Sequence, residues 1–130
     1  MPEGAPAFAR MIFESLALKY RLVLESLEEL TGTAITTIRV IGGGARNGVL
    51  NRLIADTTGC VVLAGPIEAT ALGNLAMQLL AMGEVASLDE AREIIERSFP
   101  AERFEPEQTK AWEPAYRRFR EHMEISSGRY

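Results

Sequence analysis

The sequence is poor in the residues that form disulfides and metal sites. Its 130 residues include one cysteine, Cys60, and one histidine, His122. A single cysteine cannot form a disulfide within the chain, which favours a reducing compartment, and its apolar surroundings predict a buried, unreactive thiol. His122 has no cysteine and no acidic partner at metal-ligand spacing. We therefore expect His122 at the surface and predict no metal site in this chain.

Basic residues and long apolar runs are also scarce. Lysine and arginine number 14 against 18 acidic residues, for a formal net charge of -4, whereas proteins that bind nucleic-acid backbones usually have a basic surface. Any phosphate site should therefore use backbone N–H groups. The N-terminus lacks a basic region followed by an apolar stretch, and no segment reaches membrane-spanning length. We expect a cytoplasmic protein with no nucleic-acid and no membrane partner.

What remains is the composition of one globular domain, 47% hydrophobic and 25% charged. Apolar residues recur every three or four positions where helices are expected, and β-branched or wholly apolar runs mark the strands. Small residues in the first half of the third helix predict close packing there. The elements are expected as a helix over 5–30, a strand over 35–41, a helix over 47–58, a strand over 60–64, and helices over 68–82, 87–98 and from about 112 onward.

This order, α-β-α-β-α-α-α, predicts an α/β fold in which a right-handed crossover joins a parallel strand pair. Two strands expose two edges and cannot cover the apolar surface of five helices. We therefore expect residues 1–130 to form a single partial domain, which is either part of a larger domain or half of an intimate dimer.

Several helix ends have specific signals. Gly59 suits a left-handed cap after the second helix, and Ser87 with Glu90 makes a capping box for the fourth. Pro114 is expected in the first turn of the last helix, because it would break a helix interior. Glu68 is expected to open the third helix, where the helix dipole favours an acid.

Other polar residues on helices are expected to have structural roles. Asn51 and Asp56 lie away from the apolar face of their helix, which predicts contact with solvent or with another lobe. Asn74 lies among small residues and is expected to be a buried amide with satisfied hydrogen bonds.

The turn over 42–47, Gly-Gly-Gly-Ala-Arg-Asn, points most directly to function. It lies between a predicted strand and a predicted helix. Glycines allow positive φ and let a ligand approach the backbone closely, while the first free N–H groups of the next helix attract phosphate. A nucleotide is the obvious candidate ligand.

Two familiar glycine motifs do not fit this turn. The P-loop spacing is met by Gly43 and Gly48, but Val49 and Leu50 replace the lysine and the hydroxyl residue that such a loop needs. The dinucleotide fingerprint fails because Asn47 stands where its third glycine belongs, and the following strand has no acidic residue for a ribose. Another kind of nucleotide loop remains.

Longer stretches of the sequence resemble a known family. The segment over 41–56, IGGGARNGVLNRLIAD, followed by AGPIEATALGN over 64–74, resembles the end of the FGGY family of carbohydrate kinases. The segment over 8–20, FARMIFESLALKY, resembles the same family, so the matches cover most of the chain. Gly65-Pro66 and the segment over 15–18 favour one substrate-specific branch of the family.

The resemblance implies the C-terminal part of a ribonuclease H-like lobe of the actin-like ATPase fold, in which this lobe holds the adenosine of ATP or ADP. The family's adenosine motif maps onto Gly42, Gly43 and Gly44, with Asn47 beginning the next helix. These four residues are the predicted nucleotide-binding residues. For Asn47, a contact with the base and an N-cap role are equally open. An adenine ring can lie between a glycine surface and a neighbouring helix, which agrees with this assignment.

Phosphoryl transfer also needs phosphate-binding turns, carboxylates for Mg²⁺ and a base. None is identifiable here, and in the family they come from earlier segments, so we predict no catalytic residue and no metal ligand. The chain is expected to be an adenine-nucleotide-binding C-terminal fragment, inactive alone, from a truncated gene or an expressed piece. The alternative is a stand-alone interaction module that dimerises through its truncated sheet, or that binds the missing kinase portion. An unrelated α/β nucleotide-binding domain is a third, weaker alternative.

Overall fold

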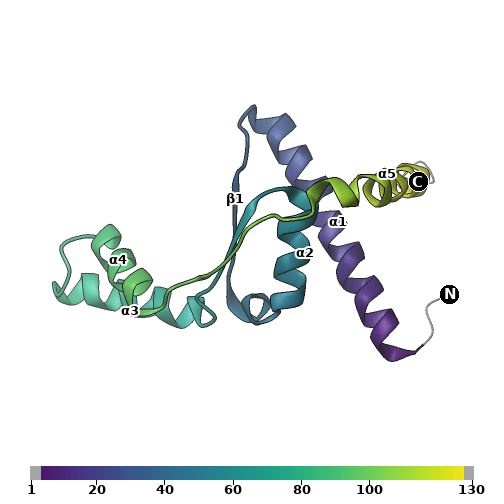
Figure 1. Ribbon diagram of the computed structural model, residues 1–130. Coiled ribbons are helices and arrows are strands. Elements are labelled where there is room, and N and C mark those ends of the chain that lie inside the picture. Colours follow the sequence, from purple (N-terminus) through teal and green to yellow (C-terminus); the bar gives the residue numbers. More distant parts are fainter. Residues whose placement is uncertain (1–3, 128–130) are drawn as a thin grey trace.

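The computed structural model describes residues 4–127, which form an α/β fold. Five α-helices, two 3-10 helices and a three-stranded sheet make up the described part (Figure 1). In chain order the elements are α1 (Ala5–Thr31), β1 (Thr37–Val40), the 3-10 helix η1 (Gly42–Arg46), α2 (Gly48–Thr58), β2 (Val61–Ala64), α3 (Ala69–Met82), α4 (Leu88–Ser98), β3 (Glu102–Phe104), the 3-10 helix η2 (Thr109–Trp112) and α5 (Glu113–Ser127).

The sheet has the order β1-β2-β3. Strands β1 and β2 are parallel, with Thr37 opposite Val61, which confirms the predicted parallel pair. Strand β3 pairs antiparallel with β2, with Phe104 opposite Val62. The prediction of a two-stranded sheet was therefore wrong. The Glu-Arg-Phe sequence of β3 has no strand periodicity of its own, and pairing with β2 gives it an extended conformation.

Helices α1 and α2 cross tightly beside the sheet (Figure 1). Ala17 is fully buried at this crossing, where its small side chain allows a close approach. The Thr57 hydroxyl of α2 lies 3.2 Å from the Ala17 carbonyl oxygen. Glycines in the left-handed conformation end both helices, Gly32 with φ 66° and Gly59 with φ 74°. The predicted cap at Gly59 is thus confirmed.

Side chains from α1, η1, α2, β2 and β3 form the main hydrophobic cluster, which we call the body cluster. Ile54 and Val62 are fully buried at its centre. Partly buried side chains of β1 and α2 pack around it. Its buried members are Ala17, Ala45, Ile54, Ala55, Val62, Ala64 and Phe104.

Helices α3 and α4 form a separate pair that stands apart from α1, α2 and α5 (Figure 1). Their own cluster, the α3–α4 cluster, buries Ala76, Val85 and Ala91. The predicted capping box is confirmed in its Ser87 half at the N-terminal end of α4, where the Ser87 hydroxyl accepts a hydrogen bond from the Glu90 N–H at 3.1 Å. The Glu90 carboxylate accepts instead from the N–H of Ala86, at 2.7 Å, one residue before the expected donor.

The expected close packing of the first half of α3 is not observed. Ala71 and Gly73 are exposed, and Leu72 is the buried residue of this half. Asn74 is also exposed, which corrects the prediction of a buried amide. The reason is that α3 packs against α4 through the side that carries Ala76, whereas Ala71 and Gly73 lie on the exposed side of the helix.

The predictions for Asn51 and Asp56 were also wrong, since both are buried. The Asp56 carboxylate accepts hydrogen bonds from the N–H groups of Glu107 and Gln108, at 2.8 and 3.3 Å. Residues distant in sequence therefore cover the polar side of α2, which an amphipathic pattern alone assigns to solvent.

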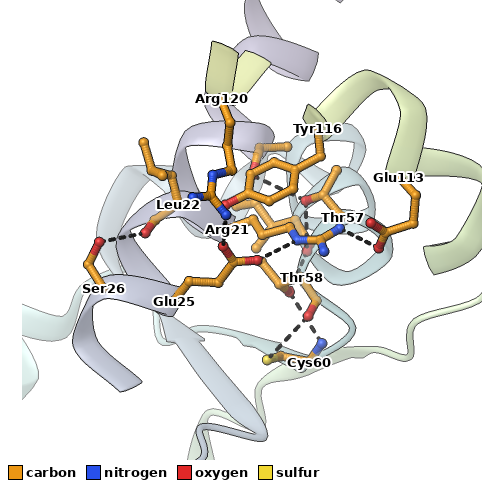
Figure 2. A network of polar contacts seen from close by, with 12 residues as sticks. Arg21, Leu22, Glu25, Ser26, Thr57, Thr58, Cys60, Glu113, Tyr116 and Arg120 are labelled. Carbon is orange, nitrogen blue, oxygen red and sulfur yellow. Dashed lines mark hydrogen bonds and ion pairs between the residues drawn. The ribbon is translucent and has the colours of Figure 1, made fainter. Parts of the chain in front are cut away.

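A polar network fastens α5 to α1 (Figure 2). The guanidinium of Arg21 lies 4.1 Å from the centroid of the Tyr116 ring and forms ion pairs with Glu25 and Glu113 at 3.0 and 2.8 Å. The Tyr116 hydroxyl donates to Glu25 at 2.5 Å. Helix α5 begins at Glu113 with Pro114 in its first turn, as predicted.

A row of large apolar side chains on α1 is exposed along most of the helix. Their exposed fractions run from 41% for Leu16 to 83% for Leu30. None of the described helices combines the length and apolarity needed to cross a bilayer. The row comprises Phe8, Met11, Ile12, Leu16, Tyr20, Val23, Leu27 and Leu30.

Candidate functional site

The three glycines of the predicted nucleotide turn occupy η1, and each has a different environment. Gly42 has φ 70°, a left-handed conformation that favours glycine, and its N–H donates to the Pro66 carbonyl at 3.1 Å. A Cβ on Gly44 would lie 3.4 Å from Val40 Cγ1, so this glycine packs on β1. A Cβ on Gly43 would meet nothing within 4 Å. The open face of the turn is therefore at Gly43.

Asn47 joins this turn to α2. Its Oδ1 accepts a hydrogen bond from the Leu50 N–H at 3.0 Å, so it is the N-cap of the helix. Its own N–H donates to the Gly44 carbonyl at 3.1 Å. The structural role considered for Asn47 is thus confirmed, while its contact with a base stays a prediction.

A cavity of about 700 Å³ lies next to the turn, beyond the carboxyl ends of the parallel strands. Ligands of α/β proteins commonly bind at such ends, and pockets of a few hundred Å³ hold molecules of nucleotide size. The walls come from the end of η1, the β2–α3 loop, the start of α3, and the segment that joins α4 to β3. The lining residues are Ala45, Arg46, the segment 64–68, Ala71, Leu72, the segment 98–100 and Glu102.

None of the four predicted binding residues forms a wall of this cavity. Gly42, Gly43, Gly44 and Asn47 lie in or beside η1, and the cavity is lined by the last two residues of that element. Gly42 is tied to the cavity wall at Pro66 through its N–H, which donates to the Pro66 carbonyl. The structure therefore places the predicted residues at the edge of the cavity, and their contact with a nucleotide stays a prediction.

Two lining residues were not predicted from sequence. Arg46 directly follows the glycines and is exposed, so its guanidinium can reach a ligand. Phe99 follows α4 and is 51% exposed, and an exposed aromatic ring offers a stacking surface. Arg46 could have been predicted as a ligand contact from the sequence, because it directly follows the three glycines. No local pattern marked Phe99, because the chain returns to the sheet only after α4.

Charges at the cavity are weakly coupled. Arg46 Nη2 lies 3.7 Å from Glu68 Oε1, and both side chains are more than two-thirds exposed. Such a pair contributes little to stability, so Arg46 can exchange this partner for a ligand. Glu68 immediately precedes α3 but makes no side-chain capping bond.

Cys60, His122 and any clusters of metal-binding side chains are the other candidates for chemistry in this chain. Cys60 is buried, as predicted, and its thiol donates to the Ile35 carbonyl at 3.1 Å. Burial raises the pKa of the Cys60 thiol, which keeps it in the unreactive protonated form. His122 is exposed. Within residues 4–127, no three His, Cys, Asp or Glu side chains lie close enough together to hold a metal ion.

Comparison with known proteins gives a consistent family. The model for the C-terminal domain of the FGGY family of carbohydrate kinases matches residues 1–82. A rhamnulokinase of Bacteroides thetaiotaomicron is 45% identical over 92% of this chain and 25% of its own length. The rhamnulokinase of Bacillus subtilis is 46% identical over 82% of this chain and 22% of its own length. The rhamnulokinase of Enterococcus faecalis is 49% identical over 78% of this chain and 21% of its own length. The chain spans about a quarter of these relatives or less.

Proposed function

This chain belongs to the FGGY family of carbohydrate kinases as part of its C-terminal domain, and we propose that it is the adenosine-binding segment of a rhamnulokinase-like enzyme. In this proposal the strands and helices are the end of a ribonuclease H-like lobe of the actin-like ATPase fold. The parallel β1–β2 pair with its crossover helix α2 agrees with that assignment.

The cavity beside η1 is the observation that carries the proposal. It joins the end of the glycine turn to the start of α3, two elements that are separated in the chain by helix α2 and strand β2. In this site the adenosine lies along the open face at Gly43, and the base enters the cavity. Arg46 and Phe99 supply stacking or charge contacts, since both line its wall. Asn47 remains the candidate for a hydrogen bond to the base, because its side-chain amide keeps N–H donors beyond its capping bond.

In the whole enzyme, the reaction would transfer the γ-phosphoryl group of ATP to L-rhamnulose, giving ADP and L-rhamnulose 1-phosphate. The relatives are named rhamnulokinase, and the sugar assignment rests on their identity of 45–49%. The bound Mg²⁺ would neutralise the phosphates, and its ligands are placed in other segments of such an enzyme. This chain alone would bind the adenosine end of the nucleotide and would not catalyse the transfer.

An amide NMR titration of the chain with ADP tests the proposal. Saturable shifts are expected at Gly43, Arg46 and Asn47. Without the phosphate contacts of a complete cleft, a dissociation constant near millimolar, about 4 kcal/mol, is expected. Shifts that do not saturate, or that spread over the whole chain, would contradict a preformed adenosine site.

Gly43→Ala provides the sharper comparison. Its φ is not left-handed and its Cβ would meet nothing, so the variant should fold normally. The added methyl would occupy the open face and weaken ADP binding by about tenfold, through loss of close approach. Gly73→Ala is the matched control, because its Cβ also meets nothing within 4 Å and Gly73 does not line the cavity. If the two variants bound ADP with equal affinity, the glycine turn would be excluded from the binding site.

The exposed apolar row on α1 favours a second candidate function, an interaction module. Strand β1 has a neighbour on one side, and the large side chains of α1 offer a continuous apolar surface. A second copy of the chain could cover both the free edge of β1 and the apolar surface of α1. Sedimentation equilibrium across a range of concentrations checks this: a dimer that Leu16→Glu dissociates would support the module, and a monomer at all concentrations would contradict it.

A further inference from the structure

Asn51 links the glycine turn to α2 from inside the molecule. The residue has no exposed surface. Its Nδ2 donates to the Ala45 carbonyl at 3.1 Å, and its backbone N–H donates to the Asn47 carbonyl at 3.0 Å. The side chain therefore reaches back from α2 to the end of η1. This contact explains why a residue expected to face solvent is buried.

The side-chain amide of Asn51 contributes little net free energy to folding, although it is buried and forms a hydrogen bond. Its Oδ1 is buried and has no hydrogen-bond partner among the described residues. A buried acceptor left without a partner costs at least as much free energy as one hydrogen bond returns. A leucine of similar shape would avoid that cost, although it would leave the Ala45 carbonyl without the Asn51 donor. The distinctive effect of the asparagine is thus on the position of the Ala45 carbonyl and not on net stability.

The held carbonyl lies at the junction between the core and the cavity. Ala45 is a member of the body cluster and also lines the cavity. The carbonyl of Gly44, one residue earlier, accepts the N–H of Asn47. Two successive carbonyls of η1 are therefore fastened to the start of α2, while Gly43 faces open space.

We propose that Asn51 is a positioning residue for the glycine turn. By holding Ala45, it fixes η1 against α2 and keeps Gly43 and Arg46 in place for an adenine nucleotide. The nucleotide part of this inference rests on the proposed function, whereas the positioning of the turn does not. Asn51 itself, being fully buried, would make no contact with the nucleotide.

Asn51→Leu in the full chain tests the role, with Thr57→Val as the matched control. Thr57 is also fully buried on α2, but its hydroxyl lies against α1 at the far end of the helix. Without nucleotide, Asn51→Leu should speed amide exchange at Asn47 by about tenfold, because the Ala45 carbonyl loses its partner. It should also shift the amide signals of Gly43 and Gly44. Thr57→Val should change neither.

The ADP titration then separates the two proposals. Asn51→Leu should weaken ADP binding about tenfold relative to Thr57→Val, since a loosened turn presents its binding conformation less often. If Asn51→Leu does not fold, Asn51→Ala removes the side-chain donor without adding bulk and should loosen the turn in the same way. Unchanged exchange and shifts at the turn would overturn the positioning role. A loosened turn in a chain that never binds ADP would support that role and contradict the proposed function.

Discussion

The body cluster and the α3–α4 cluster differ in how far apart in the sequence their contacting residues lie. The body cluster brings together Ala17 and Phe104, from the first helix and the last strand. The α3–α4 cluster joins Ala76 to Ala91, within two consecutive helices. Because its contacts join distant parts of the chain, we expect the body to unfold as one cooperative unit, whereas the helix pair depends on local contacts. Regions with few buried apolar contacts open at lower free energy than the core of a protein.

This difference bears on the candidate site, because the cavity lies between the two regions. Ala45 and Ala64 on one side belong to the body cluster. Ala71 and Phe99 on the other side belong to the helix pair or adjoin it. One wall is thus fixed by the core, while the other should adjust more easily to a ligand.

The largest effect should come from Ile54→Ala. Ile54 is fully buried in the body cluster, so the substitution should lower the free energy of unfolding by about 3 kcal/mol through lost burial and a cavity. Urea denaturation followed by circular dichroism measures this change. All elements of the body should unfold together, at the same lowered urea concentration. A change below about 1 kcal/mol would show that this cluster is not the cooperative core.

An intermediate effect is expected from Tyr116→Phe, which removes the hydroxyl that donates to Glu25. The loss should be about 1.5 kcal/mol, because the acceptor is a charged carboxylate. Hydrogen exchange should show faster opening of α5 with little change in α2. Equal acceleration throughout the body would mean that α5 is part of the core rather than attached to it by the network.

The same residue predicts a pH dependence. Burial, followed by the hydrogen bond to Glu25, raises the pKa of Tyr116 above the value of about 10 for an exposed tyrosine. The stabilisation by the protonated phenol is complete below about pH 10 and is lost as pH rises towards the raised folded-state pKa. Wild type should therefore lose stability above about pH 10 more steeply than Tyr116→Phe. Parallel curves for the two proteins would contradict this assignment.

The smallest global effect should come from Ile95→Ala, the same truncation in the other cluster. Ile95 is partly buried on α4 and packs against the α3–α4 cluster. The cost of about 1 kcal/mol should be confined to α3 and α4. Amide exchange measures it residue by residue, with Ile54→Ala as the comparison. Unfolding of the body with the helix pair would show that the two regions are one unit.

Local signals were sufficient for most helix ends. Gly59, Ser87 and Pro114 occupy the cap or first-turn positions that their chemistry favours. The first helix and the parallel pair were also predictable from periodicity and β-branched runs. The glycine turn was visible too, although its three glycines serve different purposes: a left-handed φ at Gly42, close packing at Gly44 and open space at Gly43.

Features that depend on distant residues were not predictable in this way. Strand β3 exists because β2 offers it a free edge, and Asp56 is buried because the segment over 107–108 donates to it. Asn51 is buried by a nearer contact, with the Ala45 carbonyl six residues before it, but this contact needs the conformation of η1, which the helical periodicity of α2 does not indicate.

The order of residues along the chain is therefore enough to establish the helices, the glycine turn and the membership of a kinase family. The helices and the turn depend on dihedral preferences, caps and spacing within a few residues, and the family membership depends on sequence similarity along most of the chain. The walls of the cavity and the burial of the polar face of α2 depend instead on which segments meet in space. Hydrogen bonds and packing between separate elements settle those features, many of them between residues far apart in sequence, and helical or strand periodicity does not encode them.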